Sequence, residues 1–147
     1  MKITLVVVGR LKEKFLVDGV AEYLKRLHKF AAVEVKEISE CRTPEEEGRR
    51  ILSQVPQNSW LCALDVSGVE MNSEGFAKKI AALNLNGVSN LTFAIGGAFG
   101  ISDELRRAAN FRLSLSQMTL THQMARLLLV EQIYRAFKIN RNEPYHW

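Results

Sequence analysis

The sequence predicts an α/β domain with a mostly parallel sheet and helices on both faces. Short apolar runs rich in β-branched residues alternate with longer segments in which apolar residues recur at helical spacing. The connections between these segments are short, and no internal repeat or low-complexity stretch interrupts them. With 147 residues, of which 47% are hydrophobic and 24% charged, the chain is long enough to form one domain, residues 1–147, around a substantial core.

The first half of the chain contains three predicted strands and two predicted helices. Thr43-Pro44-Glu45 marks the start of the second helix, because threonine caps a helix, proline suits its first position and acids stabilise its first turn. The expected order is a strand at Lys2–Val8, a helix at Leu11–Phe30, a strand at Val33–Ile38, a helix from Pro44 that ends before Pro56, and a strand at Trp60–Leu64 that is closed by Asp65 and a Ser67-Gly68 turn.

The second half continues the alternation. Its expected order is a helix capped by Ser73 that runs to about Leu83, a strand at Leu91–Ile95, a glycine-rich loop, a short helix capped by Ser102, a strand at Phe111–Leu115 and a last helix at Thr121–Ile139. The last helix contains four successive apolar residues, Leu127 to Val130. A helix with one buried stripe lacks such a run, so we expect burial on more than one side and a homodimer interface as the second buried surface.

Composition narrows the class of protein. No apolar run approaches the roughly 18 residues that span a bilayer, and the first residues lack the apolar segment of a signal peptide. Cys41 and Cys62 are too few and too isolated for a disulfide framework or a zinc site. We therefore expect a cytoplasmic protein without a metal, with both thiols reduced and Cys62 in the core.

The charge distribution is compatible with an RNA partner. The net charge is +4, and basic residues gather near the C-terminal tail: Arg126, Arg135, Lys138 and Arg141. A basic surface of this kind favours contact with phosphates. The same residues also suit an ordinary solvated helix face, so charge alone leaves both interpretations open.

Two loops in the last third of the chain have the character of ligand-binding segments. Gly96-Gly97-Ala98-Phe99-Gly100 lies between a strand and a capped helix, where glycine permits close approach of a ligand to the backbone. It matches neither G-x-G-x-x-G nor G-x-x-x-x-G-K-[ST], and a glycine turn can equally be structural. The second loop, Ser116 to Thr119, connects the last strand to the last helix.

Polar residues of the last helix and the tail complete the candidate site. Arg126 interrupts an apolar helix, so we expect it to have an anionic partner. Glu131 and Arg135 have the spacing of a helical ion pair. Pro144 followed by Tyr145 and His146 indicates a tail that docks on the domain, and His146 is suited to proton transfer near neutral pH.

Several of these segments together resemble a known family. The matching motifs are Leu64-Asp65 with Gly68, Ile95-Gly96-Gly97 through Gly100-Ile101-Ser102, Leu113–Ser116, Leu127–Glu131 with Tyr134-Arg135-Ala136, and Pro144-Tyr145-His146. Over essentially its whole length the chain resembles the ribosomal RNA large subunit methyltransferase H family. These are small SPOUT-class methyltransferases that modify N3 of a pseudouridine.

The resemblance implies a SPOUT-type C-terminal trefoil knot, a homodimer and S-adenosyl-L-methionine as cofactor. It implies that the substrate is a pseudouridine in the helix 69 loop of 23S rRNA, within the assembled ribosome. Cofactor contacts carry over to Leu64, Gly96, Leu115, Ser116, Gln117, Met118, Thr119 and Leu120.

The chain departs from the family pattern at two positions. Thr121 stands where the family usually has proline and is expected to cap the helix equally well. Trp147 replaces a basic terminal residue, which is expected to weaken contact with RNA slightly.

A mechanism follows as a hypothesis from the resemblance. The N3 atom of a pseudouridine must lose its proton as it attacks the methyl group. His146, or a water that it orients, would accept this proton. Arg126 or Arg135 would stabilise the negative charge on the base, and Tyr145 would stack on the base or pack against the cofactor.

Three other functions compete with this one. A non-catalytic ribosome-associated RNA-binding protein would have no use for two cofactor loops. A nucleotide-dependent enzyme of the doubly wound type would be expected to carry one of the missing phosphate-binding fingerprints. A purely structural dimer would leave the polar tail unexplained.

Overall fold

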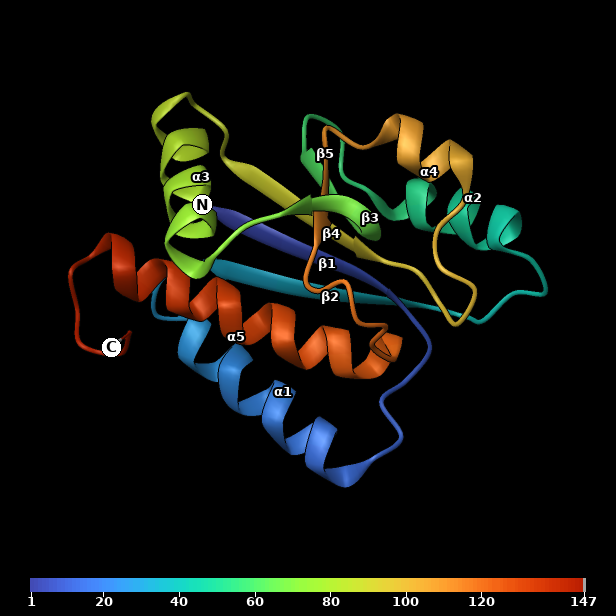
Figure 1. Ribbon diagram of the computed structural model, residues 1–147, viewed down its shortest axis with the longest axis horizontal. Helices are drawn as coiled ribbons and strands as arrows, with labels where there is room; N and C mark the ends of the chain where they lie inside the picture. Colours follow the sequence, from blue (N-terminus) through green and yellow to red (C-terminus); the bar gives the residue numbers. More distant parts are fainter. Residues whose placement is uncertain (147) are drawn as a thin grey trace.

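The computed structural model describes residues 1–146, and the expectation for Trp147 lies outside the described residues. One five-stranded sheet has the strand order β2-β1-β4-β3-β5, and every neighbouring pair of strands is parallel (Figure 1). The elements are β1 (Lys2–Val8), α1 (Lys14–Leu27), β2 (Ala32–Ile38), α2 (Pro44–Gln54), β3 (Trp60–Glu70), α3 (Ser73–Leu85), β4 (Asn90–Ile95), α4 (Asp103–Ala108), β5 (Phe111–Ser114) and α5 (His122–Asn140). The predicted α/β class with a parallel sheet is confirmed.

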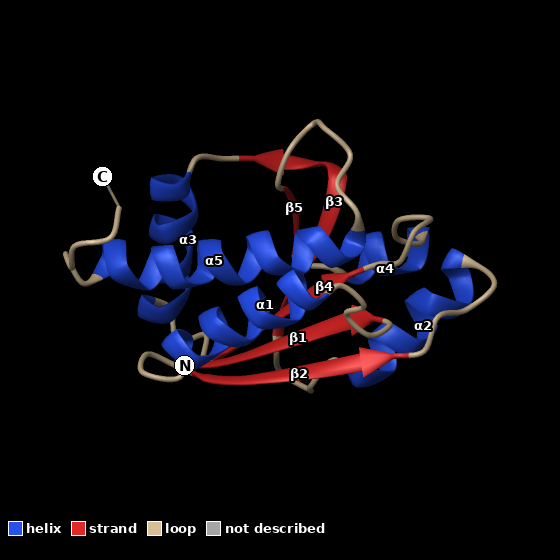
Figure 2. Ribbon diagram, turned by 90° about the horizontal axis from the view of Figure 1, so that it is seen from below, coloured by secondary structure: helices blue, strands red, loops and turns tan. Residues whose placement is uncertain are grey.

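The direction of each connection decides which face its helix covers. The connections through α1 and α3 run toward β2, whereas those through α2 and α4 run toward β5. Crossovers between parallel strands share one hand, so opposite directions require opposite faces. Helices α1 and α3 accordingly pack on one face together with α5, and α2 and α4 pack on the other (Figure 2).

The sheet is buried on both sides, and β1 shows this directly. Its alternate residues enter two separate apolar clusters: Leu5 packs with Phe93 and Leu129 on one side, and Val6 packs with Ile51 and Leu105 on the other. A strand buried on both faces is expected to be almost entirely apolar, as β1 is from Ile3 to Val8 apart from the buried Thr4.

Cys62 in β3 belongs to the first of these clusters and is 2% exposed. Burial raises the pKa of its thiol to about 12, so the thiol stays protonated at neutral pH. The predicted place of Cys62 in the core is confirmed.

Strand β3 is longer than expected: it continues past Leu64 to Glu70. It pairs with β5 through Leu64, loses register, and pairs again from Val69. Asp65 accepts hydrogen bonds from the backbone N–H and hydroxyl of Ser67, which turns the chain out of the strand. Gly68 then lies against the Arg112 carbonyl, where a Cβ would be 2.6 Å from the oxygen. The expected Ser67-Gly68 turn is thus a bulge within one strand.

Several predicted boundaries also shift. Asn72, and not Ser73, caps α3 by accepting from the Gly75 N–H at 2.8 Å, while the Ser73 hydroxyl donates to Gln132. Helix α1 is shorter than the predicted Leu11–Phe30, because the chain enters it from a loop without a side-chain cap and leaves it through turns after Leu27. The predicted caps Thr43, Ser102 and Thr121 are confirmed, each accepting a backbone hydrogen bond in its first turn.

Helix α5 crosses one face of the sheet and packs against both α1 and α3 (Figure 2). Leu129 and Val130 are fully buried, and Leu127 packs on α1 at Gly19. The predicted burial on more than one side is confirmed, and contacts within a single chain account for most of it. Leu128 is the residue of this apolar run that remains exposed to solvent in a single chain, with 39% of its surface accessible. Within residues 1–146, no helix is both long enough and apolar enough to cross a membrane.

Candidate functional site

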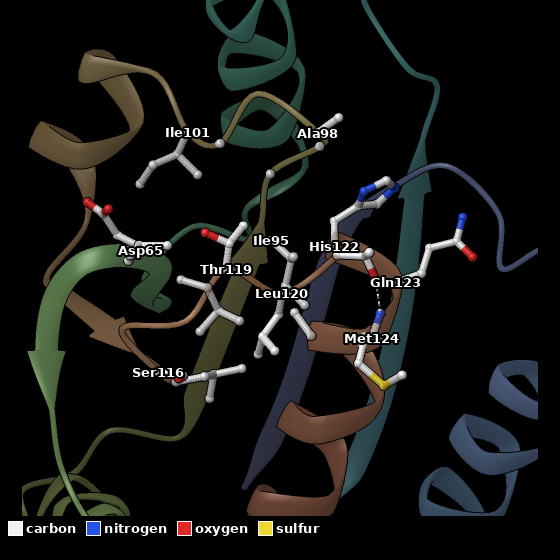
Figure 3. A pocket seen from close by; sticks show the side chains of 18 of the residues that line it. Asp65, Ile95, Ala98, Ile101, Ser116, Thr119, Leu120, His122, Gln123 and Met124 are labelled. Atoms are coloured by element: carbon white, nitrogen blue, oxygen red, sulfur yellow. Dashed lines mark hydrogen bonds between the residues drawn. The ribbon is translucent and has the colours of Figure 1, made fainter.

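The carboxyl ends of several strands open into one cavity of about 1010 Å³. Its walls come from four segments: the loop after β1 with the start of α1, the bulge of β3, the glycine loop after β4, and the connection from β5 into α5. Figure 3 shows Asp65, Ile95, Ile101, Thr119 and Leu120 around this space. The full lining is Lys12, Glu13, Phe15, Leu16, Leu64, Asp65, Val66, Ile95, Gly96, Gly97, Ala98, Gly100, Ile101, Arg106, Leu113, Leu115, Ser116, Met118, Thr119, Leu120, Thr121, His122, Gln123, Met124 and Ala125.

Sheet topology explains why the cavity lies at this edge. The chain leaves β4 toward the face of α4, whereas it leaves the neighbouring strands β1 and β3 toward the opposite face. Loops that diverge in this way leave a crevice outside the carboxyl ends of the strands, which is the usual ligand site of such sheets.

The glycine loop after β4 bends back on itself at the cavity wall. The Gly100 N–H donates to the Gly97 carbonyl at 3.1 Å, and Gly100 has a φ of +79°. A Cβ on Gly96 would overlap with the Gly100 carbonyl. The tight bend therefore requires glycine, and Gly96, Gly97 and Gly100 present their backbone to the cavity.

The second predicted loop forms the facing wall. Ser116 organises it by accepting a hydrogen bond from the Met118 N–H at 2.9 Å, while the Ser114 hydroxyl donates to the Ser116 carbonyl at 3.1 Å. Thr121 then caps α5 by accepting from the Met124 N–H at 3.1 Å. These local bonds fix the path of the backbone from β5 to α5 along the cavity.

Asp65 is the charged group of the cavity wall with the most hydrogen bonds. Both Arg106 and Arg112 donate to its Oδ2 at 3.0 Å, and Ser67 donates to its Oδ1. Burial opposes ionisation of this carboxyl group, but the Ser67 N–H and the two guanidinium groups together lower its pKa to about 2. Asp65 is thus an anion at neutral pH, already neutralised by its own chain.

Seven of the eight predicted cofactor residues line this cavity; Gln117 is not part of the described lining. Sequence reasoning missed the wall formed by Lys12 to Leu16 and the contribution of His122. The Nε2 atom of His122 is buried and has no hydrogen-bond partner within residues 1–146. The rule that ligands bind at the carboxyl ends of parallel strands would have pointed to the segment after β1.

Arg126 lies in the protein interior behind the cavity. Its side chain is 2% exposed and donates to Glu37 Oε2 at 2.9 Å, to the Gly9 carbonyl at 2.9 Å and to the Val8 carbonyl at 3.4 Å. The expected anionic partner is therefore Glu37, and the inclusion of Arg126 in a basic surface is wrong, because its side chain is buried. The other members are also paired: Arg135 with Glu131, and Lys138 and Arg141 with Glu143.

The C-terminal tail docks on the far part of α5, as predicted. The Tyr145 hydroxyl donates to Glu131 Oε1 at 2.9 Å and lies 3.0 Å from the Tyr23 hydroxyl. Burial, the hydrogen bond with Tyr23 and the nearby Glu131 carboxylate raise the pKa of Tyr145, so its phenol stays protonated. The predicted ion pair between Glu131 and Arg135 is also present, with a closest distance of 2.6 Å.

His146 has a partner at each ring nitrogen. Its Nδ1 lies 3.0 Å from Arg135 Nη1, and its Nε2 lies 2.7 Å from Glu74 Oε1. A guanidinium can only donate, so Nδ1 accepts and the proton of the neutral ring sits on Nε2, directed at Glu74. The docked tail therefore leaves no free lone pair on this imidazole.

The tail follows the C-terminal end of α5 (Figure 1), whereas the cavity is lined by the first turn of this helix. The described lining reaches Ala125 and includes none of Arg126, Arg135, Tyr145 and His146. Arg135 lies ten residues beyond Ala125, or roughly 15 Å along the helix axis. Within one chain, the structure thus brings the predicted cofactor residues together and keeps the predicted catalytic residues of the tail apart from them.

Comparison with known families identifies the fold. A family model described as "Predicted SPOUT methyltransferase" matches residues 1–146. The chain belongs to the SPOUT methyltransferase family.

Curated relatives cover the same length as this SPOUT chain. Ribosomal RNA large subunit methyltransferase H from Halothermothrix orenii is 48% identical, and the alignment covers 99% of each chain. The proteins of the same name from Carboxydothermus hydrogenoformans and Enterococcus faecalis are 48% and 44% identical, again over 99% of each chain. The predicted resemblance is confirmed.

Solved structures with the same fold are more distant in sequence. A probable methylase family protein from Haemophilus influenzae has a TM-score of 0.55 at 12% identity, covering 95% of this chain and 66% of that one. The tRNA (m1G37) methyltransferase from Aquifex aeolicus has the same score and identity, covering 92% of this chain and 70% of that one. At this identity the likeness supports the SPOUT fold only.

Proposed function

We propose that this SPOUT protein transfers a methyl group from S-adenosyl-L-methionine to N3 of a pseudouridine in the helix 69 loop of 23S rRNA, within the assembled ribosome. The names of its full-length relatives support a large-subunit rRNA substrate. Because ribosomes are in the cytoplasm, a ribosomal substrate implies that the protein acts there. We further propose a homodimer and a trefoil-knotted C-terminal region, both supported by membership of the family.

The observation that carries the proposal is the cavity at the carboxyl edge of the sheet. Its volume suits a ligand of drug size, its walls are mainly apolar, and two tightly bent loops expose backbone groups to it. When bound, S-adenosylmethionine would supply a methyl group on a positively charged sulfur. Leu64, Gly96 and the loop from Leu115 to Leu120 would hold it.

The residues of the tail would act on the base. We propose that His146, or a water that it orients, accepts the N3 proton. To do so the ring must release Arg135, because the lone pair of the neutral ring is on Nδ1, whereas Nε2 carries the proton directed at Glu74. Glu74 would remain at Nε2 and orient the ring. The released Arg135 guanidinium would lie close to the negative charge that develops on the base.

The structure restricts the roles that Tyr145 and Arg126 can have in the proposed reaction. The hydroxyl of Tyr145 is committed to Glu131 and Tyr23, so its ring is the part that would stack on the base or pack against the cofactor. Arg126 would act from the interior by joining α5 to the ends of β1 and β2, and not by touching the base.

A second copy of the chain would complete the site. Reacting atoms must come within about 3.5 Å of each other, whereas the tail of one chain lies roughly 15 Å along α5 from its own cavity. We therefore propose that the tail of one protomer serves the cavity of its partner. Phe15, Val66 and Met118 line the cavity yet remain largely exposed in a single chain, which suits a surface covered by another copy.

Methyl transfer to ribosomes tests the proposal. Labelled S-adenosylmethionine is incubated with ribosomes that lack the modification, and the product nucleoside is identified by mass spectrometry. A methylated pseudouridine from the large-subunit RNA is the expected result. Cofactor binding without transfer would mean that the substrate is wrong.

The alternative is a non-catalytic ribosome-associated RNA-binding protein. A ligand that binds only the folded state raises the melting temperature. S-Adenosylhomocysteine is therefore expected to raise the melting temperature of this protein. No shift, together with binding to ribosomes, would favour the alternative.

A further inference from the structure

Glu47 is a buried carboxylate that the proposed reaction does not use. It is the fourth residue of α2 and is 4% exposed, whereas Glu45 and Glu46 beside it are exposed. A buried carboxylate is costly unless hydrogen bonds or a positive potential compensate it. The first turn of α2 supplies part of that potential, because the N-terminal end of a helix carries partial positive charge.

The carboxylate of Glu47 contacts the glycine loop from the face of the sheet that α2 covers. Its Oε1 accepts the Gly97 N–H at 3.1 Å, across 50 residues of sequence. A Cβ on Gly97 would lie 2.8 Å from Glu47 Oε2 and 2.9 Å from Oε1. The carboxylate therefore lies directly against the backbone of Gly97, and glycine is what permits this approach.

The next residue of α2 supports the other end of the same loop. A Cβ on Gly48 would overlap with the Ser102 hydroxyl, which caps α4 by accepting from the Leu105 N–H at 3.1 Å. Helix α2 thus fixes the segment from Gly97 to Ser102 at both ends, by a hydrogen bond and by close packing. This segment forms a wall of the cavity, although Glu47 itself is not part of the described lining.

We propose that Glu47 is a positioning residue that holds the glycine loop in the shape that binds S-adenosyl compounds. This inference rests on the proposed function of the cavity. The role needs an acceptor at the end of a side chain of this length, and not a negative charge as such. Glutamine should therefore replace Glu47, whereas alanine and the shorter aspartate should not.

The test compares Glu47→Ala, Glu47→Asp and Glu47→Gln with the exposed control Glu46→Ala. The affinity for S-adenosylhomocysteine is measured by calorimetry well below the melting temperature, and exchange of the Gly97 amide hydrogen is followed by NMR. The Ala and Asp variants are expected to bind roughly ten-fold more weakly and to exchange the Gly97 amide faster. The Gln variant is expected to stay within about three-fold of the wild type, and the control to be unchanged.

Wild-type affinity and wild-type Gly97 exchange in a folded Ala or Asp variant would overturn the inference. Equal weakening in the Gln variant would also overturn it, because that result requires the charge. If the wild type itself does not bind S-adenosylhomocysteine, the proposed function fails. Exchange at Gly97 then decides separately whether Glu47 holds the loop.

Discussion

Asp65 joins the bulge of β3 to α4 and β5, whose arginines lie 41 and 47 residues further along the chain. Its carboxylate accepts from Ser67 in its own bulge, from Arg106 in α4 and from Arg112 in β5. The side chain is 6% exposed, so water screens these bonds little. One residue thus fixes the bulge of β3 against the two elements that follow the glycine loop.

Replacing Asp65 by asparagine should make stability less dependent on pH. The pKa of Asp65 falls from 3.8 to about 2 on folding, so the carboxylate stabilises the fold above pH 3.8 and loses this contribution as pH falls to about 2. We expect Asp65→Asn to be less stable than the wild type at pH 6, with about 2 kcal/mol of that difference lost by pH 2. Urea unfolding at both pH values measures this, and a difference independent of pH would contradict it.

A methyl group at Gly96 should damage ligand binding more than folding. The added Cβ would overlap with the Gly100 carbonyl and open the bend of the loop at the cavity wall. We expect Gly96→Ala to bind S-adenosylhomocysteine at least roughly ten-fold more weakly. Gly75→Ala, at the start of α3, is the control, because Gly75 lies outside the described lining. Equal affinities of the two variants would show that the tight bend is dispensable.

At the scale of elements, α5 is joined to the sheet by a buried charge. Arg126 donates to Glu37 in β2 and to carbonyls at the end of β1. Removing Glu37 leaves the buried Arg126 charge without its partner, whereas this charge penalty is absent once Arg126 is also removed. Removing Arg126 takes the donor from the Val8 and Gly9 carbonyls whether or not Glu37 is present. The pair therefore sets how the first turns of α5 meet the sheet beside the cavity.

A double-mutant cycle should show strong coupling between these two elements. We expect Arg126→Met and Glu37→Gln each to lower the free energy of unfolding, and the double variant to lose about 1–3 kcal/mol less than their sum. Urea unfolding of the four proteins gives the coupling. Additive losses would mean that the two side chains stabilise the fold independently.

Local signals explain which elements could be predicted. The caps Thr43, Ser102 and Thr121 and the two cavity loops were predictable, because each depends on a few consecutive residues. The bulge at Gly68 was not, since its conformation depends on the carbonyl of Arg112 in another strand.

Partners distant in sequence were beyond prediction for the same reason. Glu37 and Arg126 are 89 residues apart, and Glu47 and Gly97 are 50 apart. The residue types indicated that Arg126 needed an anion but not which one. The separation of the tail from the cavity likewise depends on the length and packing of α5, and not on the local sequence of either segment.

At the scale of the whole molecule, the proposed exchange of tails can be tested with mixed dimers. Gly96→Ala is expected to disable the cavity, and His146→Ala the tail. If each site combines the cavity of one protomer with the tail of its partner, a mixed dimer retains one intact site. An equal mixture reassembled from separated protomers should then recover roughly a quarter of wild-type activity. No recovery, with mixed dimers shown to form, would place both parts of the site in one chain.

The two cysteines differ in exposure, so the protein can be labelled at one position without a substitution. The thiol of Cys62 is closed off in the core and fully protonated, whereas Cys41 is partly exposed just before α2. Because the thiolate is the reactive form, a maleimide or methanethiosulfonate reagent should modify Cys41 and spare Cys62. A spin label at Cys41 would then give one distance between two copies without any engineered residue.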